Sequence, residues 1–380
     1  MKIAIFTDTF APDVNGVART LKRLTDYLES KGHEYKVFAP ESTKESLFSS
    51  HIHRFASSSF YLYPECRLAW PNMLQVKSEL IRFKPDIIHV ATPFNIGLCG
   101  LHYAKKLNIP IVGSYHTDFD QYLEFYDLQL FSKLLWKYML WFHRPLQKIF
   151  VPSEETKQQV LNQGFENVHI WSRGVDCQLF HPNYLRKEII QEYQIKEKFI
   201  LSYVGRLAPE KDVQTLMKIS HQLPEHLRSK VHFLIVGDGP SKEEMMKESP
   251  DNMTFAGYAS GEKLAKIYSG SDLFIFPSPT ETFGNVVLES LAAGTPVIGA
   301  NSGGVKNIIQ QGKTGYLCET GSAAEFISAI DTLLQNDALR YQMGMSARAY
   351  ALSQTWDSIF EGLLSAYSEV LDQREFIRYA

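Results

Sequence analysis

Short apolar runs alternate with helical segments along most of the chain, and this alternation limits the possible folds more than any other feature. In the first half the runs are KIAIFTDTF, YKVFAP, PDIIHVATP, IPIVGSYH and QKIFVPS, with amphipathic segments such as Val17–His33 between them. Strands of a parallel sheet have this continuous apolar character because helices cover both faces of the sheet. The sequence therefore predicts a doubly wound α/β sheet.

The pattern starts again after a turn-rich segment at Gly174–Pro182, and two long helical segments finish the chain. A chain of 380 residues suits two domains of roughly 170–200 residues better than one core. We expect two Rossmann-like domains, residues 1–174 and 175–355, and a C-terminal helix, residues 356–380, that returns to the first domain. Two such domains would face each other across a cleft, and ligands bind such sheets at the carboxyl ends of the strands.

Composition excludes several other classes of protein. The net charge of −3 gives no reason to expect a nucleic-acid partner. The four cysteines, Cys66, Cys99, Cys177 and Cys318, are too scattered for a disulfide framework or a zinc site. The N-terminal apolar run is too short for a signal peptide, and no stretch approaches the ~20 apolar residues of a membrane span. We therefore expect a cytoplasmic protein with reduced thiols.

The strongest candidate for a binding site is Ser278–Gly294, SPTETFGNVVLESLAAG. It combines the end of a strand, a small-residue turn and the start of a helix, an arrangement that directs backbone N–H groups and a positive dipole end toward an anion. Glu281 and Glu289 lie on either side of the turn, and Gly284 would let its backbone approach a ligand closely. The alternative is that both are ordinary carboxylates near a helix start, which suits Glu281 better than Glu289.

A second candidate is GRLAPEKD, Gly205–Asp212, which also follows a strand. Arg206 and Lys211 could reach the two phosphates of a diphosphate, Arg206 through its planar guanidinium and Lys211 as a point charge. The alternative is a solvated loop in which Glu210 pairs with Lys211.

Together these motifs resemble a known family. NGVARTL, SYHTD, VPSEE, SRGVD, GRLAPEKD, VGDGP and ETFGNVVLESLAAGTPV with SGG are similar to motifs of the retaining glycosyltransferases of family 4, which have the two-domain GT-B fold. The resemblance covers essentially the whole chain. The opening TDTFAPDVNGVART most resembles members that glycosylate membrane lipids, namely diacylglycerol glucosyl- and sulfoquinovosyltransferases and GDP-mannose-dependent mannosyltransferases.

The resemblance implies a role for each donor-site residue. Arg206 and Lys211 would neutralise the departing diphosphate, Glu281 would bind hydroxyls of the donor sugar, and Glu289 would bind both ribose hydroxyls. The turn amides would contact the sugar and the distal phosphate; they belong to Phe283, Gly284, Asn285 and Val286. Backbone groups around Phe255–Ser260 would contact the base.

In the first domain the resemblance makes Gly16 the glycine that approaches a phosphate and His116 the histidine beside the reaction centre. His116 thus joins Arg206, Lys211 and Glu281 as a catalytic candidate, although a lone histidine more often has a structural role. Arg173 and Asp176 would lie near the hinge. We expect no cofactor and no metal, because Arg206, Lys211 and a helix N-terminus can stabilise a leaving diphosphate, and we discount the D-x-D at Asp118–Asp120.

A basic and aromatic segment, Leu128–Ile149, has the composition of a helix that lies on an anionic membrane surface. It contains no acidic residue. The residues that we expect at a membrane or acceptor surface are Lys133, Trp136, Lys137, Trp141, Arg144 and Lys148. The alternative is a helix that packs on the sheet with its basic ends in water.

These observations predict a retaining hexosyltransferase that uses a UDP- or GDP-hexose and acts on a membrane lipid as a peripheral protein on the inner face of the membrane. Retention is implied by the family alone. Two alternatives stay open, a soluble or polysaccharide-precursor acceptor and a non-catalytic partner subunit. An epimerase or phosphorylase of similar fold would need a different set of cleft residues. A dinucleotide dehydrogenase is excluded because no G-x-G-x-x-G follows the first strand.

Overall fold

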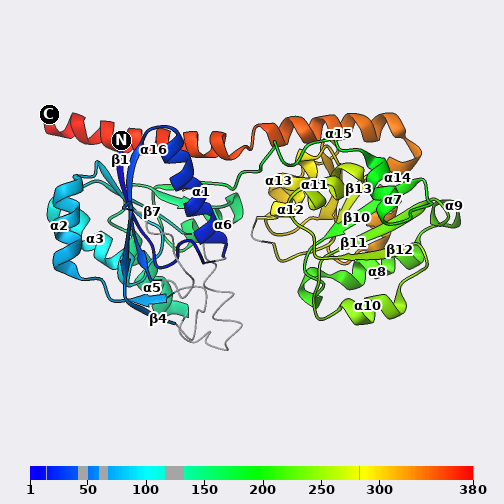
Figure 1. The fold of residues 1–380 in the computed structure, drawn as a ribbon, viewed down its shortest axis with the longest axis horizontal. Coiled ribbons are helices and arrows are strands. Elements are labelled where there is room, and N and C mark those ends of the chain that lie inside the picture. Colours follow the sequence, from blue (N-terminus) through cyan, green and yellow to red (C-terminus); the bar gives the residue numbers. More distant parts are fainter. Residues whose placement is uncertain (14, 42–49, 60–66, 116–131, 282, 380) are drawn as a thin grey trace. The chain divides into compact units, whose positions relative to one another are not determined.

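The chain divides into two compact units in the computed structural model, which describes residues 1–13, 15–41, 50–59, 67–115, 132–281 and 283–379. Unit 1 comprises Met1–Ser172 and Ile359–Ala380, and unit 2 comprises Arg173–Ser358. The expected boundaries, after residues 174 and 355, lie close to these. Figure 1 shows that each unit consists of a sheet with helices on both sides.

Unit 1 contains, among its described residues, a seven-stranded sheet in the order β3-β2-β1-β6-β7-β8-β9, and every neighbouring pair is parallel. The strands of this sheet are β1 (Lys2–Phe6), β2 (Glu34–Pro40), β3 (Ile52–Phe55), β6 (Ile87–Val90), β7 (Ile111–Ser114), β8 (Ile149–Val151) and β9 (Val168–Ile170). Its helices are α1 (Gly16–Ser30), α2 (Met73–Phe83), α3 (Asn95–Leu107), α5 (Ser132–His143) and α6 (Glu154–Asn162). The predicted doubly wound sheet is confirmed.

Some elements of unit 1 are not marked by the alternation of apolar runs. They are β3, the helix α2, and a small antiparallel pair formed by β4 (Ser57–Ser59) and β5 (Arg67–Ala69). The predicted cap of α6 is confirmed, because the Ser153 side chain accepts a hydrogen bond from the Thr156 N–H. Cys99 and Cys318 are buried thiols, and Cys177 is a half-buried one.

Unit 2 contains a six-stranded parallel sheet, again counted over the described residues, in the order β12-β11-β10-β13-β14-β15. This is the strand order of a nucleotide-binding doubly wound fold. The strands are β10 (Phe199–Val204), β11 (Val231–Val236), β12 (Met253–Gly257), β13 (Leu273–Phe276), β14 (Val297–Ala300) and β15 (Gly315–Cys318). All residues of the central strands β10, β11 and β13 are buried, as their continuous apolar sequences predict.

The helices of unit 2 pack in two groups around this sheet. The helix α8 contacts α14, whereas α11 contacts α7 and α12, and α12 contacts α15. The helices are α7 (Arg186–Glu192), α8 (Val213–Gln222), α9 (Glu225–Arg228), α10 (Lys242–Glu248), α11 (Gly261–Gly270), α12 (Asn285–Ala292), α13 (Val305–Ile308), α14 (Ala323–Gln335) and α15 (Asp337–Leu352), with a 3₁₀ turn, η2, at Pro209–Lys211.

The chain ends in three helices after β15, so the expectation of two was wrong. The third is α16 (Trp356–Tyr379), which follows α14 and α15. Asn336 separates α14 from α15, because its backbone leaves the helical region and its side chain accepts a hydrogen bond from the Leu339 N–H. An Asn that caps a new helix in this way divides what looks like one helical stretch in the sequence.

The C-terminal helix α16 is part of the core of unit 1. Phe360, Leu363, Tyr367 and Val370 are fully buried at helical spacing. The Tyr367 hydroxyl forms a hydrogen bond with Nδ1 of the buried His89 on β6, whose other ring nitrogen bonds Ser114. Burial lowers the pKa of His89 to about 3, so this ring is neutral at physiological pH.

We predict that Tyr367→Ala lowers the free energy of unfolding of unit 1 by about 3–5 kcal/mol, because it opens a large cavity beneath α16. Tyr367→Phe keeps the ring and loses only the hydrogen bond to His89, so it should cost about 1–2 kcal/mol. Urea unfolding followed by tryptophan fluorescence measures this, because Trp70, Trp136, Trp141 and Trp171 lie in unit 1. An equal loss of unfolding free energy in the two variants would show that packing of the Tyr367 ring does not hold α16 in place.

Candidate functional site

The site in unit 2 follows from the position of β10 in its sheet. The chain passes from β10 to β11 on one side, while β13 lies on the other side of β10. Such a reversal of strand order leaves a crevice at the carboxyl ends of the two central strands. The loop after β10 carries Arg206 and Lys211, and the loop after β13 carries Glu281, so the topology brings both motifs to one edge.

A cavity of about 170 Å³ lies at this edge. Its lining residues are Arg173, Val204, Gly205, Arg206, Lys211, Phe276, Glu281, Phe283, Gly284, Asn285 and Val286. The structure therefore brings together most of the residues that the sequence predicts for the donor site. Complete sites for small molecules commonly measure about 300–1,000 Å³, so this cavity has room for only part of a nucleotide sugar, such as its diphosphate.

The loops after β10 and β13 are joined by an ion pair. Lys211 Nζ lies 2.6 Å from Glu281 Oε1, and the two side chains are only 19% and 22% exposed. Arg206 is 65% exposed and lies 3.4 Å from Glu210, a long contact at the surface that contributes little. The pairing of Glu210 with Lys211, which a simple surface loop would show, is therefore not observed. Arg206 can turn toward an anionic ligand at small cost.

The start of α12 supplies the polar wall of the cavity. Gly284 is the N-cap and has φ +90°, and among the described residues no side chain caps this helix end. A Cβ at Gly284 would lie 3.3 Å from Val305 Cγ2, so a side chain there would be both strained and crowded. The helix start therefore presents backbone N–H groups and a positive dipole end, which favour an anion.

Three residues to which the sequence prediction gave no role hold these loops in place. The Tyr203 hydroxyl donates to the Arg206 carbonyl oxygen at 3.0 Å, and Thr280 Oγ1 donates to the Glu210 carbonyl oxygen at 3.0 Å. The Gly304 N–H donates to the Glu281 carbonyl oxygen at 2.6 Å. Burial raises the pKa of Tyr203, so its hydroxyl stays a donor. In the sequence Tyr203 is simply one apolar position of a strand, and nothing there marks this contact.

The VGDGP turn, Val236–Pro240, supports the Arg206 loop by close backbone contact. A Cβ on Gly237 would lie 1.9 Å from the Gly205 carbonyl oxygen, and a Cβ on Gly239 would lie 2.3 Å from the Leu207 carbonyl oxygen. The Leu207 N–H donates to the Asp238 carbonyl oxygen at 2.9 Å. Close packing of the two turns therefore explains why both positions are glycine, whether or not a nucleoside contacts them.

Glu289 lies outside the 170 Å³ cavity, although it belongs to the same helix. It is half-buried, and the Tyr268 hydroxyl donates to its Oε2 at 3.3 Å. Burial, together with this carboxylate, raises the pKa of Tyr268 well above its ordinary value. Its predicted contact with a ribose stays a prediction. If Glu289 does contact the ribose, the nucleoside must extend out of the cavity toward α11, because Glu289 lies beside Tyr268 of that helix.

Unit 1 also has a switch in strand order, between β1 and β6. Gly16 is the first residue of α1 after β1, and the Asn15 side chain caps the helix by accepting from the Ala18 N–H at 2.8 Å. The predicted position of Gly16 at the start of a helix is confirmed. His116 and the D-x-D segment Asp118–Asp120 lie outside the described residues.

Asp8 follows β1 at this edge and is completely buried. Its carboxylate accepts from Thr92 Oγ1 at 2.7 Å and from the Ile96 N–H at 2.9 Å, so it caps the start of α3. Burial raises the pKa of Asp8 to about 6, although these hydrogen bonds act in the opposite direction. The carboxyl of Asp8 therefore ionises near pH 6 in the folded protein, compared with 3.8 for an unperturbed aspartate.

We predict that Asp8→Asn removes a pH-dependent loss of stability. The raised pKa means that the folded state binds more protons than the unfolded state between about pH 4 and 6, so stability falls as the pH rises through this range. A shift of about two pKa units corresponds to roughly 3 kcal/mol. The unfolding free energy of the variant, relative to the unsubstituted protein, should rise by up to this amount between pH 4 and 7. Urea unfolding at several pH values measures this. If the difference in unfolding free energy between the two proteins did not change with pH, the raised pKa of Asp8 would be contradicted.

Part of the basic and aromatic segment forms α5 (Ser132–His143), which has an exposed face. Lys133, Leu134, Lys137 and Trp141 are exposed along this helix, and the exposed Arg144 follows its last residue. They form what we call the α5 face. No helix among the described residues is long and apolar enough to span a bilayer.

Two of the residues expected at a membrane surface are not there. Trp136 is 7% exposed and stacks on Tyr115 in the core of unit 1. Lys148 is also 7% exposed and forms an ion pair with Glu369 of α16. The prediction was wrong for both, because Trp136 lies on the inner side of α5 and Lys148 lies beyond its end.

Known protein families match both units. The model of Glycosyltransferase Family 4 matches residues 14–179, and that of Glycosyl transferases group 1 matches residues 186–350. Among solved structures, sucrose-phosphate synthase from Thermosynechococcus elongatus superposes with a TM-score of 0.74 at 19% identity, covering 98% of this chain and 100% of that one. This likeness shows the GT-B fold.

Three curated relatives are similar over most of the chain. A GDP-mannose-dependent alpha-mannosyltransferase of Mycobacterium tuberculosis is 31% identical and covers 98% of both chains. The sulfoquinovosyl transferase SQD2 of Arabidopsis thaliana is 31% identical over 93% of this chain and 71% of its own. An alpha-monoglucosyldiacylglycerol synthase of Streptococcus pneumoniae is 28% identical over 83% of this chain and 75% of its own.

Proposed function

Because the chain belongs to the glycosyltransferases of family 4, we propose that it transfers a hexosyl group from a UDP- or GDP-hexose to an acceptor hydroxyl with retention at the anomeric carbon. The observation that carries the proposal is the meeting of Arg206, Lys211, Glu281 and the start of α12 around one small cavity. Cations and backbone N–H groups at such a place suit the diphosphate of a nucleotide sugar.

Negative charge grows on the diphosphate as its bond to the sugar breaks. Arg206, Lys211 and the amides at the start of α12 would stabilise this charge. Lys211 and the amides are held in position before the ligand arrives, whereas Arg206 would turn toward it. Such preorganised groups lower the barrier because their interaction is strongest in the transition state. Glu281, already beside Lys211, would accept hydrogen bonds from hydroxyls of the donor sugar.

For the chemical step we propose attack from the face that the diphosphate leaves. The bond between the anomeric carbon and the diphosphate oxygen breaks, and a bond to the acceptor oxygen forms on the same face. The acceptor proton passes to the leaving diphosphate oxygen, so no protein nucleophile is required. Positive charge from Arg206 and Lys211 would take the place of a divalent metal, and activity should therefore persist in a chelator. We further propose that His116, which lies outside the described residues, acts beside the reacting carbon, as the family resemblance implies.

A membrane lipid is the acceptor class that we favour. The name of the Streptococcus pneumoniae relative gives a glycosylated diacylglycerol as its product. The α5 face carries three cations and an exposed indole, which suit an anionic bilayer surface. Peripheral binding at the inner face of the membrane would bring the enzyme to such an acceptor. The alternatives are a soluble or polysaccharide-precursor acceptor and a non-catalytic subunit, and the latter would not need the Lys211–Glu281 pair.

We predict that Lys211→Ala folds normally but loses about 10²–10³-fold in kcat, the usual cost of removing one such charge-stabilising donor. The matched control is Lys218→Ala, an exposed lysine of α8 that does not line the cavity. Transfer from UDP- and GDP-hexoses to a membrane lipid extract measures turnover, and calorimetric titration with UDP, GDP and ADP identifies the base. Unchanged turnover in folded Lys211→Ala would refute the assignment.

We also predict that the α5 face mediates binding to anionic membranes. Changing its three cations to Gln should abolish most sedimentation with phosphatidylglycerol-containing vesicles; these are Lys133, Lys137 and Arg144. A control that removes the same charge from unit 2 should sediment like the unsubstituted protein; it changes Lys218, Lys230 and Lys247. Equal sedimentation of the two variants would count against this surface, and raising the salt concentration should weaken binding.

A further inference from the structure

A large pocket lies in unit 1, at the edge of its sheet where the strand β7 begins. Its volume is about 890 Å³. It is bounded by α3, by Ile109–Ile111 at the amino end of β7, by the end of α5 and the segment that follows it to Gln147, and by Gln373 of α16. Since reaction partners meet at the carboxyl ends of the strands, a ligand in this pocket would not be a reactant. No step of the proposed mechanism uses it.

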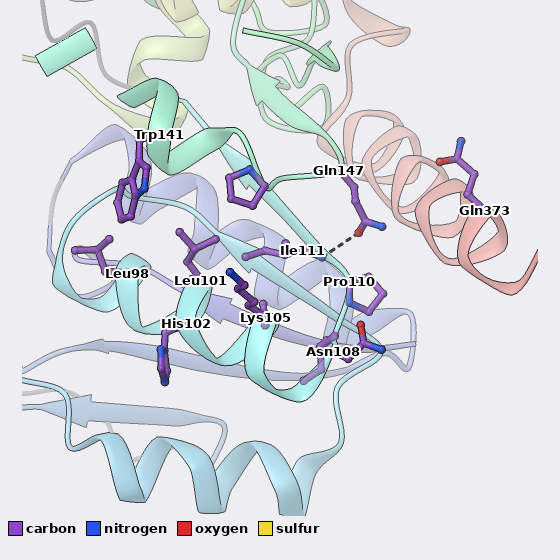
Figure 2. A pocket seen from close by; sticks show the side chains of 13 residues that line it. Leu98, Leu101, His102, Lys105, Asn108, Pro110, Ile111, Trp141, Gln147 and Gln373 are labelled. Atoms are coloured by element: carbon purple, nitrogen blue, oxygen red, sulfur yellow. Dashed lines mark hydrogen bonds between the residues drawn. The ribbon is translucent and has the colours of Figure 1, made fainter. Parts of the chain in front are cut away.

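The pocket is mainly apolar. Leu98, Leu101 and Lys105 lie along one side of α3 at helical spacing and line the pocket. The two leucines are half-buried and also pack against the core of unit 1, whereas Lys105 is exposed. In Figure 2 the Trp141 indole points toward Leu98 and Leu101 from the opposite side. Gln147 Oε1 accepts a hydrogen bond from the Ile111 N–H at 3.1 Å and closes one end, as the dashed line in Figure 2 shows.

The lining of this pocket carries positive charge and, among the residues that the structure describes, no acidic residue. Its charged residue is Lys105. Trp141, which is 59% exposed, also lines a neighbouring hollow of about 520 Å³, whose charged lining residues are Lys137, Arg144 and Glu166. An apolar pocket therefore opens beside cations of the α5 face. This combination suits a ligand with an apolar chain and an anionic head.

We propose that this pocket holds one acyl chain of an anionic phospholipid taken from the membrane surface. The chain would lie along Leu98, Leu101 and Ile111 beneath the Trp141 indole, and the phosphate would remain near Lys105 and the α5 face. Unit 1 would then be anchored by a bound lipid as well as by surface charge. This lipid is distinct from the acceptor and does not depend on the identity of the donor.

The test uses a soluble single-chain lipid and the full chain. Lauroyl lysophosphatidylglycerol, below its micelle-forming concentration, should bind with one-to-one stoichiometry in isothermal titration calorimetry. Lauroyl lysophosphatidylcholine should bind more weakly because its head has no net charge, and glycerophosphoglycerol, which has no chain, should not bind. Equal binding of the two lysolipids, binding of the chainless head group, or no binding of the anionic lysolipid would each overturn the proposal.

Variants locate the binding. Leu101→Trp should fill the pocket, and Leu98→Glu should place a negative charge in its lining, so each should abolish saturable binding. Lys105→Gln should weaken binding by up to about 5-fold, the usual limit for an exposed charge pair. Lys106→Gln, the matched control, removes the neighbouring lysine, which does not line the pocket, and should bind normally. Unchanged binding in both pocket variants would refute the assignment.

A membrane experiment separates a bound acyl chain from attraction between surface charges. Vesicles of phosphatidylglycerol and phosphatidylcholine should sediment less Leu101→Trp than unsubstituted protein, even though the α5 face is intact. Equal sedimentation of the two proteins would mean that surface charge alone is responsible and would overturn the proposal. Titration with UDP and GDP should be unaffected by Leu101→Trp, because the donor cavity is in unit 2, so failure here is distinguishable from failure of the proposed function.

Discussion

The candidate donor site depends on one constraint, the placement of β10 and β13 as neighbours in a parallel sheet. Arg206 and Glu281 are far apart in the sequence, yet the loops that carry them leave the same edge because all strands point in one direction. The ion pair between Lys211 and Glu281 then fixes the spacing of the two loops. An anion that enters the cavity meets this pair, Arg206 and the start of α12 at once.

Close backbone packing keeps this arrangement rigid without large side chains. Gly237 and Gly239 let one turn lie against the Arg206 loop. Gly303 lets a second turn lie against the Glu281 loop, because a Cβ on Gly303 would be only 2.4 Å from the Glu281 carbonyl oxygen. These contacts use backbone atoms, so side chains of the site stay available for ligand. The glycines of such motifs therefore support the site even where they do not touch the ligand.

Unit 1 uses a different means to stabilise its sheet. The first residues of the helix α16 belong to unit 2, but the rest of the helix packs its apolar side into unit 1, where the Tyr367 hydroxyl contacts the buried His89. The same unit carries the two features that we propose to contact a membrane, the α5 face and the pocket beside Trp141. These two features combine apolar surface with positive charge, whereas the cavity of unit 2 combines cations with backbone N–H groups, which suit an anion.

The sequence by itself determined the doubly wound class of both units, the turn at Gly284 and the cations Arg206 and Lys211, because each depends on local pattern and spacing. It could not distinguish the exposed from the buried residues of a basic helix, and so it placed Trp136 and Lys148 at the surface. Only the tertiary structure decided that Lys211 pairs with Glu281, that Tyr203 holds Arg206, and that a pocket opens beside Trp141. These features bring together residues that are far apart in the sequence, and a local sequence pattern does not show which distant residues lie close together in space.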